Sequence, residues 1–281
     1  MATLTFFTDI KEFRQFVKGW DASNTLGELM PSYRTAKSEV IGIIGQATWD
    51  VLITYKEDPP AEADADKAIA VELVQAALAN LTMYEHFIFI DVSKKASDGS
   101  LYRYQYDEVM ERYIQNTWTA FNDLLVHLDS KTAKFTEYAL APTYTDRQGL
   151  IVTDVNEFHK LYSIDWSAYF FTKLQAFMRE VIDDELIPRI GKWDDAKDKA
   201  DIALKVKRAL VYQTMSLAID RLDFLSLPRS IRTQLASTSI KTSRSAYSED
   251  KARYRLSTEP TSTDYTIPDD LMDEDDPFIL M

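Results

Sequence analysis

The chain has 281 residues, of which 46% are hydrophobic and 12% aromatic, enough to fill one large domain or two ordinary ones. Seven glycines and nine prolines are too few for an all-β sandwich, which needs a turn residue at every hairpin, so the composition favours helices. The net charge of −13 argues against nucleic-acid binding across the whole surface, and the absence of cysteine excludes disulfides and thiolate chemistry.

The beginning of the chain carries no recognisable targeting signal. It lacks a basic region followed by an apolar run, so we expect no signal peptide. No stretch approaches the ~18 uninterrupted apolar residues of a membrane span. We therefore expect a soluble protein of cytoplasmic origin without a membrane partner.

A short capped helix is predicted near the start. Asp9 suits the N-cap, where its carboxylate accepts backbone N–H groups of the first turn, and Glu12 three residues later can reach back to the cap. Apolar residues at helical spacing continue this helix to about Lys18. A second helix is predicted from about Ser23 to Gly45, with a kink or restart at Pro31, and a further turn or two over residues 47–55.

Two longer helices complete the first half. Residues 66–87 carry apolar side chains every three or four positions, and small alanines there predict close packing against another helix. Residues 93–100 are predicted as a turn, and residues 139–150 as a linker. Residues 106–128 are predicted as an amphipathic helix, whose broad aromatic seam packs into a core or a neighbouring subunit.

The second half repeats this order. The phrase TDIKEF at residues 8–13 returns as TDVNEF at 153–158, where Asp154 and Glu157 again suit a capped start. A long aromatic helix is predicted over about residues 165–187, ended by Pro188 and Gly191.

One longer stretch and two short ones also match between the halves. At an offset of 132, residues 66–83 and 198–215 share eight of eighteen residues. Because caps and loops recur in the same order, which packing alone does not require, we interpret the chain as a tandem duplication of an all-α unit. The alternative is that two generic amphipathic helices both use Ala, Leu and Val. The shorter echoes are Glu39-Val40-Ile41 with Glu180-Val181-Ile182 and Ile44-Gly45 with Ile190-Gly191.

The sequence thus predicts three parts. Residues 1–150 hold the first repeat and an additional long helix, residues 151–230 the second repeat, and residues 231–281 an extended arm, first basic and then acidic. Low hydrophobicity with clustered charge cannot support a core, so we expect the arm to be disordered or extended in the free chain. A solvated tail does not need the apolar residues at its end, so we expect it to dock in a partner groove rather than stay free. The candidate partner-binding residues are Tyr265, Ile267, Leu271, Met272, Phe278, Ile279, Leu280 and Met281.

The basic part of this region, residues 229–255, could meet nucleic acid or the acidic arm of a neighbouring copy. Only Tyr247 and Tyr254 are available there for stacking on bases, so protein–protein pairing is favoured.

Residue patterns for chemistry are weak. Phosphate-loop, dinucleotide-binding and hydrolase-elbow motifs are absent from the sequence. His86, His127 and His159 lack a ligand at the fourth following residue, so a structural histidine is the favoured interpretation of each. Asp183-Asp184-Glu185 diverge by about 100° per residue on a helix, which favours a solvated face over a paired-carboxylate site. We therefore predict no catalytic residue, no metal and no cofactor, and a protein that is not an enzyme.

The helix order resembles a known family. A capped TDIKEF helix, a long helix with Tyr33 and a closing Ile44-Gly45, a polar loop and an Ala/Leu-rich helix resemble the head–tail connector (adaptor) proteins of tailed bacteriophages. The resemblance covers roughly residues 8–87 and 153–225. The doubled unit, the additional helix at 106–128 and the acidic arm depart from the family's pattern.

The resemblance implies a non-enzymatic ring of identical subunits, a dodecamer, in the virion neck between capsid and tail, made in the bacterial host cytoplasm. It implies docking onto the portal protein through the C-terminal arm, residues 264–281, and contact with other neck or tail proteins. DNA would pass through the channel without sequence-specific binding, along an acidic wall to which it does not stick. The alternative is a bacterial helical adaptor, also non-enzymatic, that binds a partner protein or peptide along the aromatic seam.

Overall fold

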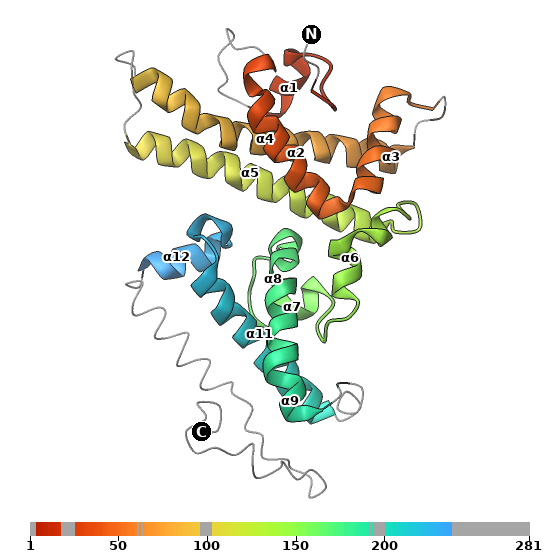
Figure 1. The fold of residues 1–281 in the computed structure, drawn as a ribbon, viewed down its shortest axis with the longest axis vertical. Helices are drawn as coiled ribbons and strands as arrows, with labels where there is room; N and C mark the ends of the chain where they lie inside the picture. The colour runs from red at the N-terminus through yellow and green to blue at the C-terminus, as the bar shows by residue number, and fades with distance from the viewer. Residues whose placement is uncertain are drawn as a thin grey trace, which may run out of the picture. The chain divides into compact units, whose positions relative to one another are not determined.

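The computed structural model describes residues 4–17, 26–60, 62, 64–95, 103–191, 193 and 200–237. Of these described residues 80% are helical, and they form no sheet, so the predicted all-α fold class is confirmed. The chain divides into two compact units, Met1–Thr145 and Asp146–Met281. Each unit is a separate helical assembly (Figure 1).

The first unit begins with the predicted capped helix. In α1 (Ile10–Phe16) the side chain of Asp9 accepts the N–H of Glu12 at 2.9 Å, as an N-cap should. In α2 (Leu26–Ile44) Pro31 lies inside the helix, which continues past it, so the predicted restart is wrong. α3 (Gln46–Glu57) follows and is longer than the turn or two expected.

Gly45 separates α2 from α3 in a conformation that requires glycine. Its φ is +82°, and its N–H donates to the carbonyl of Ile41 at 2.8 Å, which ends α2. A Cβ at this position would lie 3.0 Å from the Cβ of Ala141. Both the backbone angle and the close approach therefore disfavour a side chain here.

The core of the first unit is α4 (Ala65–Lys95), which packs against α1, α2, α3 and α5. Because other helices pack on several sides of α4, its apolar residues are distributed around its circumference and not along one stripe. Val74, Ala77 and Leu78 are fully buried. The predicted end at Phe87 is wrong, and so is the predicted turn for residues 93–95, because α4 continues to Lys95. Residues 96–100 of that turn lie outside the described residues. The apolar run FIFI that begins at Phe87 extends the helix instead of ending it.

α5 (Arg103–Ser130) runs beside α4, as the gold and yellow helices of Figure 1 show. The predicted aromatic seam packs into the core of its own unit, because α4 covers it. The buried residues of the seam are Met110, Tyr113, Thr117, Phe121, Leu124, Leu125 and Leu128.

The stretch predicted as a linker, residues 139–150, is partly helical. It contains the end of a 3-10 turn (Tyr138–Leu140) and α6 (Pro142–Arg147). Tyr138 and Ala141 are buried, which fixes the segment on the core, and a proline at the first position suits a helix start. Burial of these two side chains overrides the linker-like composition.

The second unit opens with α7 (Val155–Leu161), capped as predicted. Asp154 accepts the N–H groups of Asn156 and Glu157 at 2.6 and 3.0 Å, and Phe158 is fully buried.

The long aromatic helix starts later than predicted. α8 (Ala168–Val181) begins after its N-cap Ser167, whose hydroxyl accepts the N–H of Phe170 at 3.0 Å. The predicted start at Asp165 is wrong, because Asp165 and Trp166 have φ of +54° and +55°, outside the right-handed helical region.

Of the two residues predicted to end this helix, Gly191 does so and Pro188 does not. Residues Ile182–Leu186 form a π turn, in which the N–H of Ile187 bonds to the carbonyl of Ile182. α9 (Ile187–Ile190) follows and ends at Gly191, with φ of +69°. Pro188 does not end the helix, because it lies in the first turn of α9. A backbone N–H in the first turn has no partner within its own helix, so the missing N–H of proline is tolerated there.

α11 (Ala200–Arg221) packs against α8, α7 and the π turn. A 3-10 turn (Phe224–Ser226) and α12 (Arg229–Ser237) complete the described part of the unit. The expectation of an extended arm from residue 231 is wrong for 231–237, because Ile231 and Leu235, one helical turn apart, are both buried. The rest of the predicted arm lies outside the described residues.

Candidate functional site

The residues predicted to bind a partner all lie in the arm beyond residue 237, outside the described residues. They are Tyr265, Ile267, Leu271, Met272, Phe278, Ile279, Leu280 and Met281. What the structure brings together instead is a pair of polar anchors, one in each unit, that fasten a cap helix to the Ala-rich helix beside it.

The first anchor is built around Glu12 of α1. Its carboxylate accepts the N–H and hydroxyl of Thr8 at 2.8 and 2.9 Å, so it closes the cap one residue before the position predicted from the sequence. Gln75 of α4 donates to the other oxygen at 2.8 Å, and Lys56 at the end of α3 forms an ion pair with it. One carboxylate thus ties three helices together.

The pKa of the Glu12 carboxyl is strongly lowered by its contacts in this anchor. Burial by itself would raise its pKa, but the hydrogen bonds from Lys56, Thr8 and Gln75 lower the pKa from 4.5 to about 2. The carboxylate is therefore ionised throughout the physiological range and acts as a fixed structural charge.

The second anchor repeats this arrangement. Glu157 of α7 pairs with Lys207 of α11. Glu157 holds the place in TDVNEF that Glu12 holds in TDIKEF. Lys207 lies 132 residues after Gln75, which is the offset at which the two Ala-rich helices match in sequence. The same position of the Ala-rich helix therefore binds the same glutamate of the cap helix in both units.

The long helices that lie in sequence between the cap helix and the Ala-rich helix, α2 and α8, also match in burial. Their matching buried positions lie 145 residues apart at the start of the helices and 146 residues apart at the end, so the matching stretch is one residue longer in the second unit. A π turn accommodates one extra residue, and it lies at Ile182–Leu186, where the offset changes. This register replaces the pairing of Glu39-Val40-Ile41 with Glu180-Val181-Ile182. The matching buried pairs are Leu29 with Leu174, Tyr33 with Met178, Ala36 with Val181 and Val40 with Leu186.

Two further features occur at matching positions. Gly45 and Gly191 both follow an isoleucine, both have positive φ, and both donate their N–H to the carbonyl four residues earlier, at 2.8 and 2.9 Å. Thr82 and Thr214, 132 residues apart, are both fully buried, and neither hydroxyl has a hydrogen-bond partner among the described residues. An uncompensated buried hydroxyl is uncommon, so its presence in both units is informative.

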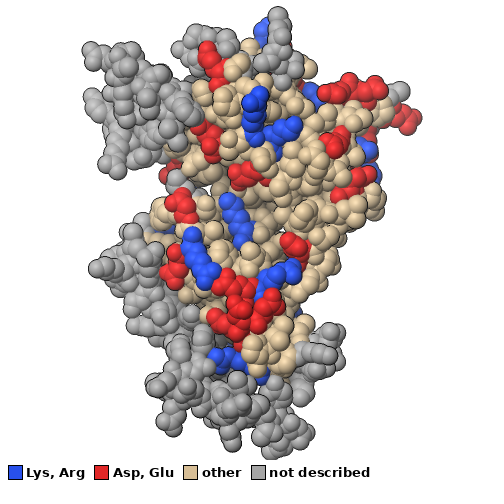
Figure 2. Space-filling view, in the orientation of Figure 1, with Lys and Arg blue, Asp and Glu red and all other residues tan. Residues whose placement is uncertain are grey.

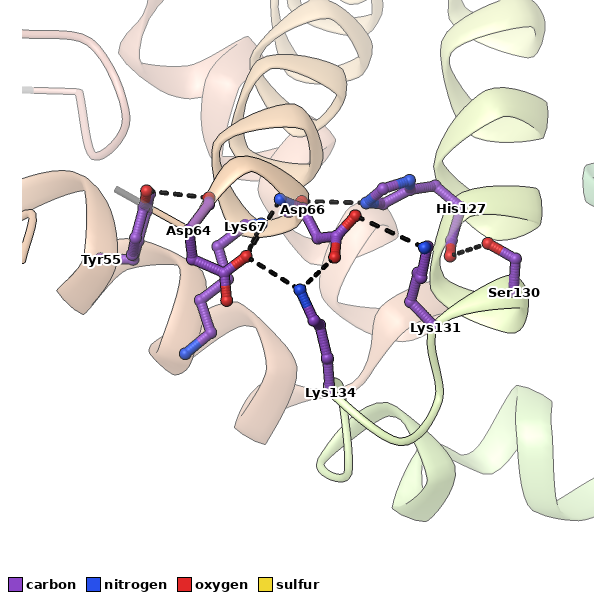
Figure 3. A network of polar contacts seen from close by, with 8 residues as sticks. All are labelled: Tyr55, Asp64, Asp66, Lys67, His127, Ser130, Lys131 and Lys134. Atoms are coloured by element: carbon purple, nitrogen blue, oxygen red, sulfur yellow. Dashed lines mark hydrogen bonds and ion pairs between the residues drawn. The ribbon is translucent and has the colours of Figure 1, made fainter. Parts of the chain in front are cut away.

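A separate polar network lies where the start of α4 meets the end of α5 (Figure 3). The carboxylate of Asp64 caps α4 by accepting the N–H of Asp66 at 3.0 Å, and Lys134 pairs with both aspartates. The hydrogen bond from Lys134 is the largest influence on Asp66 and lowers its pKa. The imidazole of His127 on α5 contacts the carbonyl of Asp66 at 2.9 Å. These contacts fasten the start of α4 to the end of α5, which is a structural role.

The other two histidines also lie in structural surroundings. His159 accepts the N–H groups of Ile164 and Trp166 on its Nδ1, at 3.2 and 3.3 Å, and its ring stacks on Trp166 at 3.9 Å. His86 is half-buried on α4, and burial lowers its pKa.

The acidic triplet of the sequence lies in the π turn. Asp183 and Asp184 are exposed, whereas Glu185 is half-buried and accepts a hydrogen bond from Gln213. Among the described residues, His, Asp and Glu side chains nowhere gather in a group of three that could hold a metal ion. None of the described helices combines the length and apolarity needed to cross a membrane.

Known proteins provide no further guide. No family model matches the chain, and neither the curated proteins nor the solved structures contain a significant match.

Proposed function

We propose that this chain is a structural protein of a bacteriophage neck, and that identical copies form a ring, a dodecamer, which joins the portal to the tail and lets DNA pass. The observation that carries the proposal is the repeated anchor, Glu12 with Gln75 and Glu157 with Lys207. It ties the capped helix to the Ala-rich helix within the helix order that resembles the connector family. We further propose that the two units arose by duplication.

The polar side chains of the two anchors support a structural role. Each is held by a hydrogen bond or an ion pair to a neighbouring helix, which stabilises a rigid module rather than leaving a group poised to react. The aromatic seam of α5 is covered by α4, so the adaptor alternative, a peptide bound along that seam, loses the surface on which it depends.

Charge supports the passage of DNA. The net charge of −13 disfavours strong contact with phosphates. Figure 2 shows a group of acidic side chains over the end of α8, with basic side chains around it. We expect the assembled ring to bind duplex DNA weakly at physiological salt; strong binding would contradict an acidic channel wall.

The proposal is tested by mixing the purified protein with portal assemblies from the same virus and imaging by negative-stain electron microscopy. We expect rings seated on the portal. Deletion of residues 264–281 should leave the circular dichroism of the helical units unchanged and abolish this joining. A truncated chain that joins the portal normally overturns the docking role. A full-length chain that stays monomeric beside the portal overturns the ring, and capture of a host protein by that monomer would favour the adaptor function.

A further inference from the structure

One face of α4 is covered by α5 along most of its length, and this face is defined by residues seven apart in sequence. Such residues lie on the same side of a helix, because seven residues make nearly two turns. The face also includes Leu73, which lies between the first two contacts. The contacts that define it are the carbonyl of Asp66 with His127 at 2.9 Å, Asn80 with Asn116 at 3.2 Å, and the ring of Phe87 with that of Tyr113 at 6.1 Å.

The corresponding face of α11 is only partly covered. At the offset of 132, Leu73, Asn80 and Phe87 correspond to Lys205, Tyr212 and Ile219. Tyr212 packs its ring against Tyr162 of α7, and Ile219 is buried, so the second half of the face is filled. In the first half, the described position is Lys205, and it is exposed.

This exposed half is basic with an apolar residue beside it. Lys205 and Arg208 are exposed, and the neighbouring Leu204 retains 45% of its surface in solvent. Neither cation makes a hydrogen bond or ion pair with another described residue, in contrast to Lys207, which holds Glu157. Two cations without a partner in the described part of the chain, beside an exposed leucine and in a chain of net charge −13, suit an acidic and partly apolar segment.

We propose that this face of α11 binds the acidic stretch at residues 264–276 of a neighbouring copy of the chain. The stretch contains seven Asp and Glu residues and no Lys or Arg. Its Ile267 and Leu271 would supply apolar side chains for Leu204, while its carboxylates pair with Lys205 and Arg208. The stretch would take the place on α11 that α5 takes on α4.

The choice of a neighbouring copy rests on the proposed ring. A contact between two different surfaces of identical chains is heterologous, and such contacts repeat head to tail and can close into a ring. The 26 residues between Ser237 and Asp264 can span roughly 90 Å when extended, enough to reach another subunit. In this arrangement residues 264–276 hold the ring together, and residues 278–281 remain available to the portal-side partner, so deletion of 264–281 would remove both contacts.

Zero-length carbodiimide cross-linking of the full-length protein tests this contact, because the reagent joins a lysine amine to a carboxylate that touches it. Copies grown in ¹⁴N and ¹⁵N media are mixed under assembling conditions, cross-linked, digested and analysed by mass spectrometry. We expect Lys205 joined to Asp or Glu residues within 264–276, in pairs of mixed isotope. The variant Arg208→Glu should lower the yield of these pairs about fivefold, the effect of losing roughly 1 kcal/mol of attraction.

Arg34→Glu is the matched control, because Arg34 is an exposed arginine on α2 and its replacement makes the same change in net charge. It should leave the yield unchanged, and a thermal melt of each variant confirms folding. Absence of Lys205 links, an equal yield in Arg208→Glu, or links confined to single-isotope pairs would each overturn the proposal. Rings that form without these links would leave the proposed function intact. Links between copies that form no ring would contradict the function but not this contact.

Discussion

The anchor at Glu12 makes a specific prediction about stability. Replacing Glu12 by Gln keeps the shape of the side chain but removes the charge that accepts hydrogen bonds from Thr8 and Gln75 and pairs with Lys56. The perturbation therefore isolates the electrostatic part of the anchor. We expect the first unit to be destabilised at neutral pH.

The magnitude follows from the pKa of Glu12, which lies at about 2 instead of 4.5. That difference corresponds to about 3.4 kcal/mol for a fully sheltered group. Because the side chains of Lys56 and Glu12 keep 28% and 18% of their surface exposed, solvent screens the pair. We expect a loss of about 1–2 kcal/mol in the free energy of unfolding.

The pH dependence has a definite sign. A carboxyl whose pKa is lowered by folding stabilises the protein fully above its unfolded value, near 4.5, and this contribution is lost as the pH falls toward about 2. The gap between wild type and Glu12→Gln should therefore be largest at pH 7. By about pH 3 roughly half of it or more should be gone.

Hydrogen exchange over α1, together with urea unfolding at pH 7 and pH 3, measures this gap and assigns it to the first unit. Glu72→Gln is the control, because Glu72 is exposed on α4 and should have little effect at either pH. If Glu12→Gln unfolds like the wild type at pH 7, or if its deficit is as large at pH 3, the anchor does not act through its charge.

Two further substitutions test the backbone and the buried hydroxyls. Gly45→Ala should cost about 2–3 kcal/mol through its positive φ and a clash, whereas Gly42→Ala, in open helical space, should stabilise by roughly 0.5–1 kcal/mol; equal melting temperatures would refute the conformational argument. Thr82→Val removes a buried hydroxyl without a partner and should stabilise by about 1 kcal/mol. Thr117→Val removes a hydroxyl that donates to a carbonyl at 2.9 Å and should destabilise the protein. If both valine variants shifted the urea midpoint in the same direction relative to the wild type, this argument would be wrong.

Several elements could be predicted from the sequence because their causes are local. The caps at Asp9 and Asp154 need only an acceptor at the right position before an apolar helical repeat, and both were correctly predicted. The isoleucine–glycine ends of the long helices depend on the conformational freedom of glycine alone. The all-α class follows from the helical spacing of apolar residues and the shortage of turn residues.

Other elements depend on contacts that the sequence does not display. The π turn at Ile182–Leu186 packs against α11, and no local sequence pattern marks it. The turn at Asp165 and Trp166 is held by His159 and by the hydrogen bond from the N–H of Ser230 to the Asp165 carboxylate. Both groups come from elsewhere in the unit, so residues 165–167 look helical when taken alone.

The two anchors differ in where the positive charge comes from, and the difference is itself predictive. In the first unit Lys56 of α3 supplies the charge and Gln75 adds a neutral hydrogen bond; the second unit has eight residues between Gly191 and Ala200, too few for a helix like α3. There Lys207, at the position equivalent to Gln75, supplies the charge from α11 itself.

If the anchors are equivalent, Lys56→Met should destabilise the first unit by about 1 kcal/mol, and adding Gln75→Lys should restore most of that loss. Urea unfolding of the single and double variants measures the recovery. A double variant no more stable than Lys56→Met would show that the two positions are not interchangeable and would remove the main support for duplication.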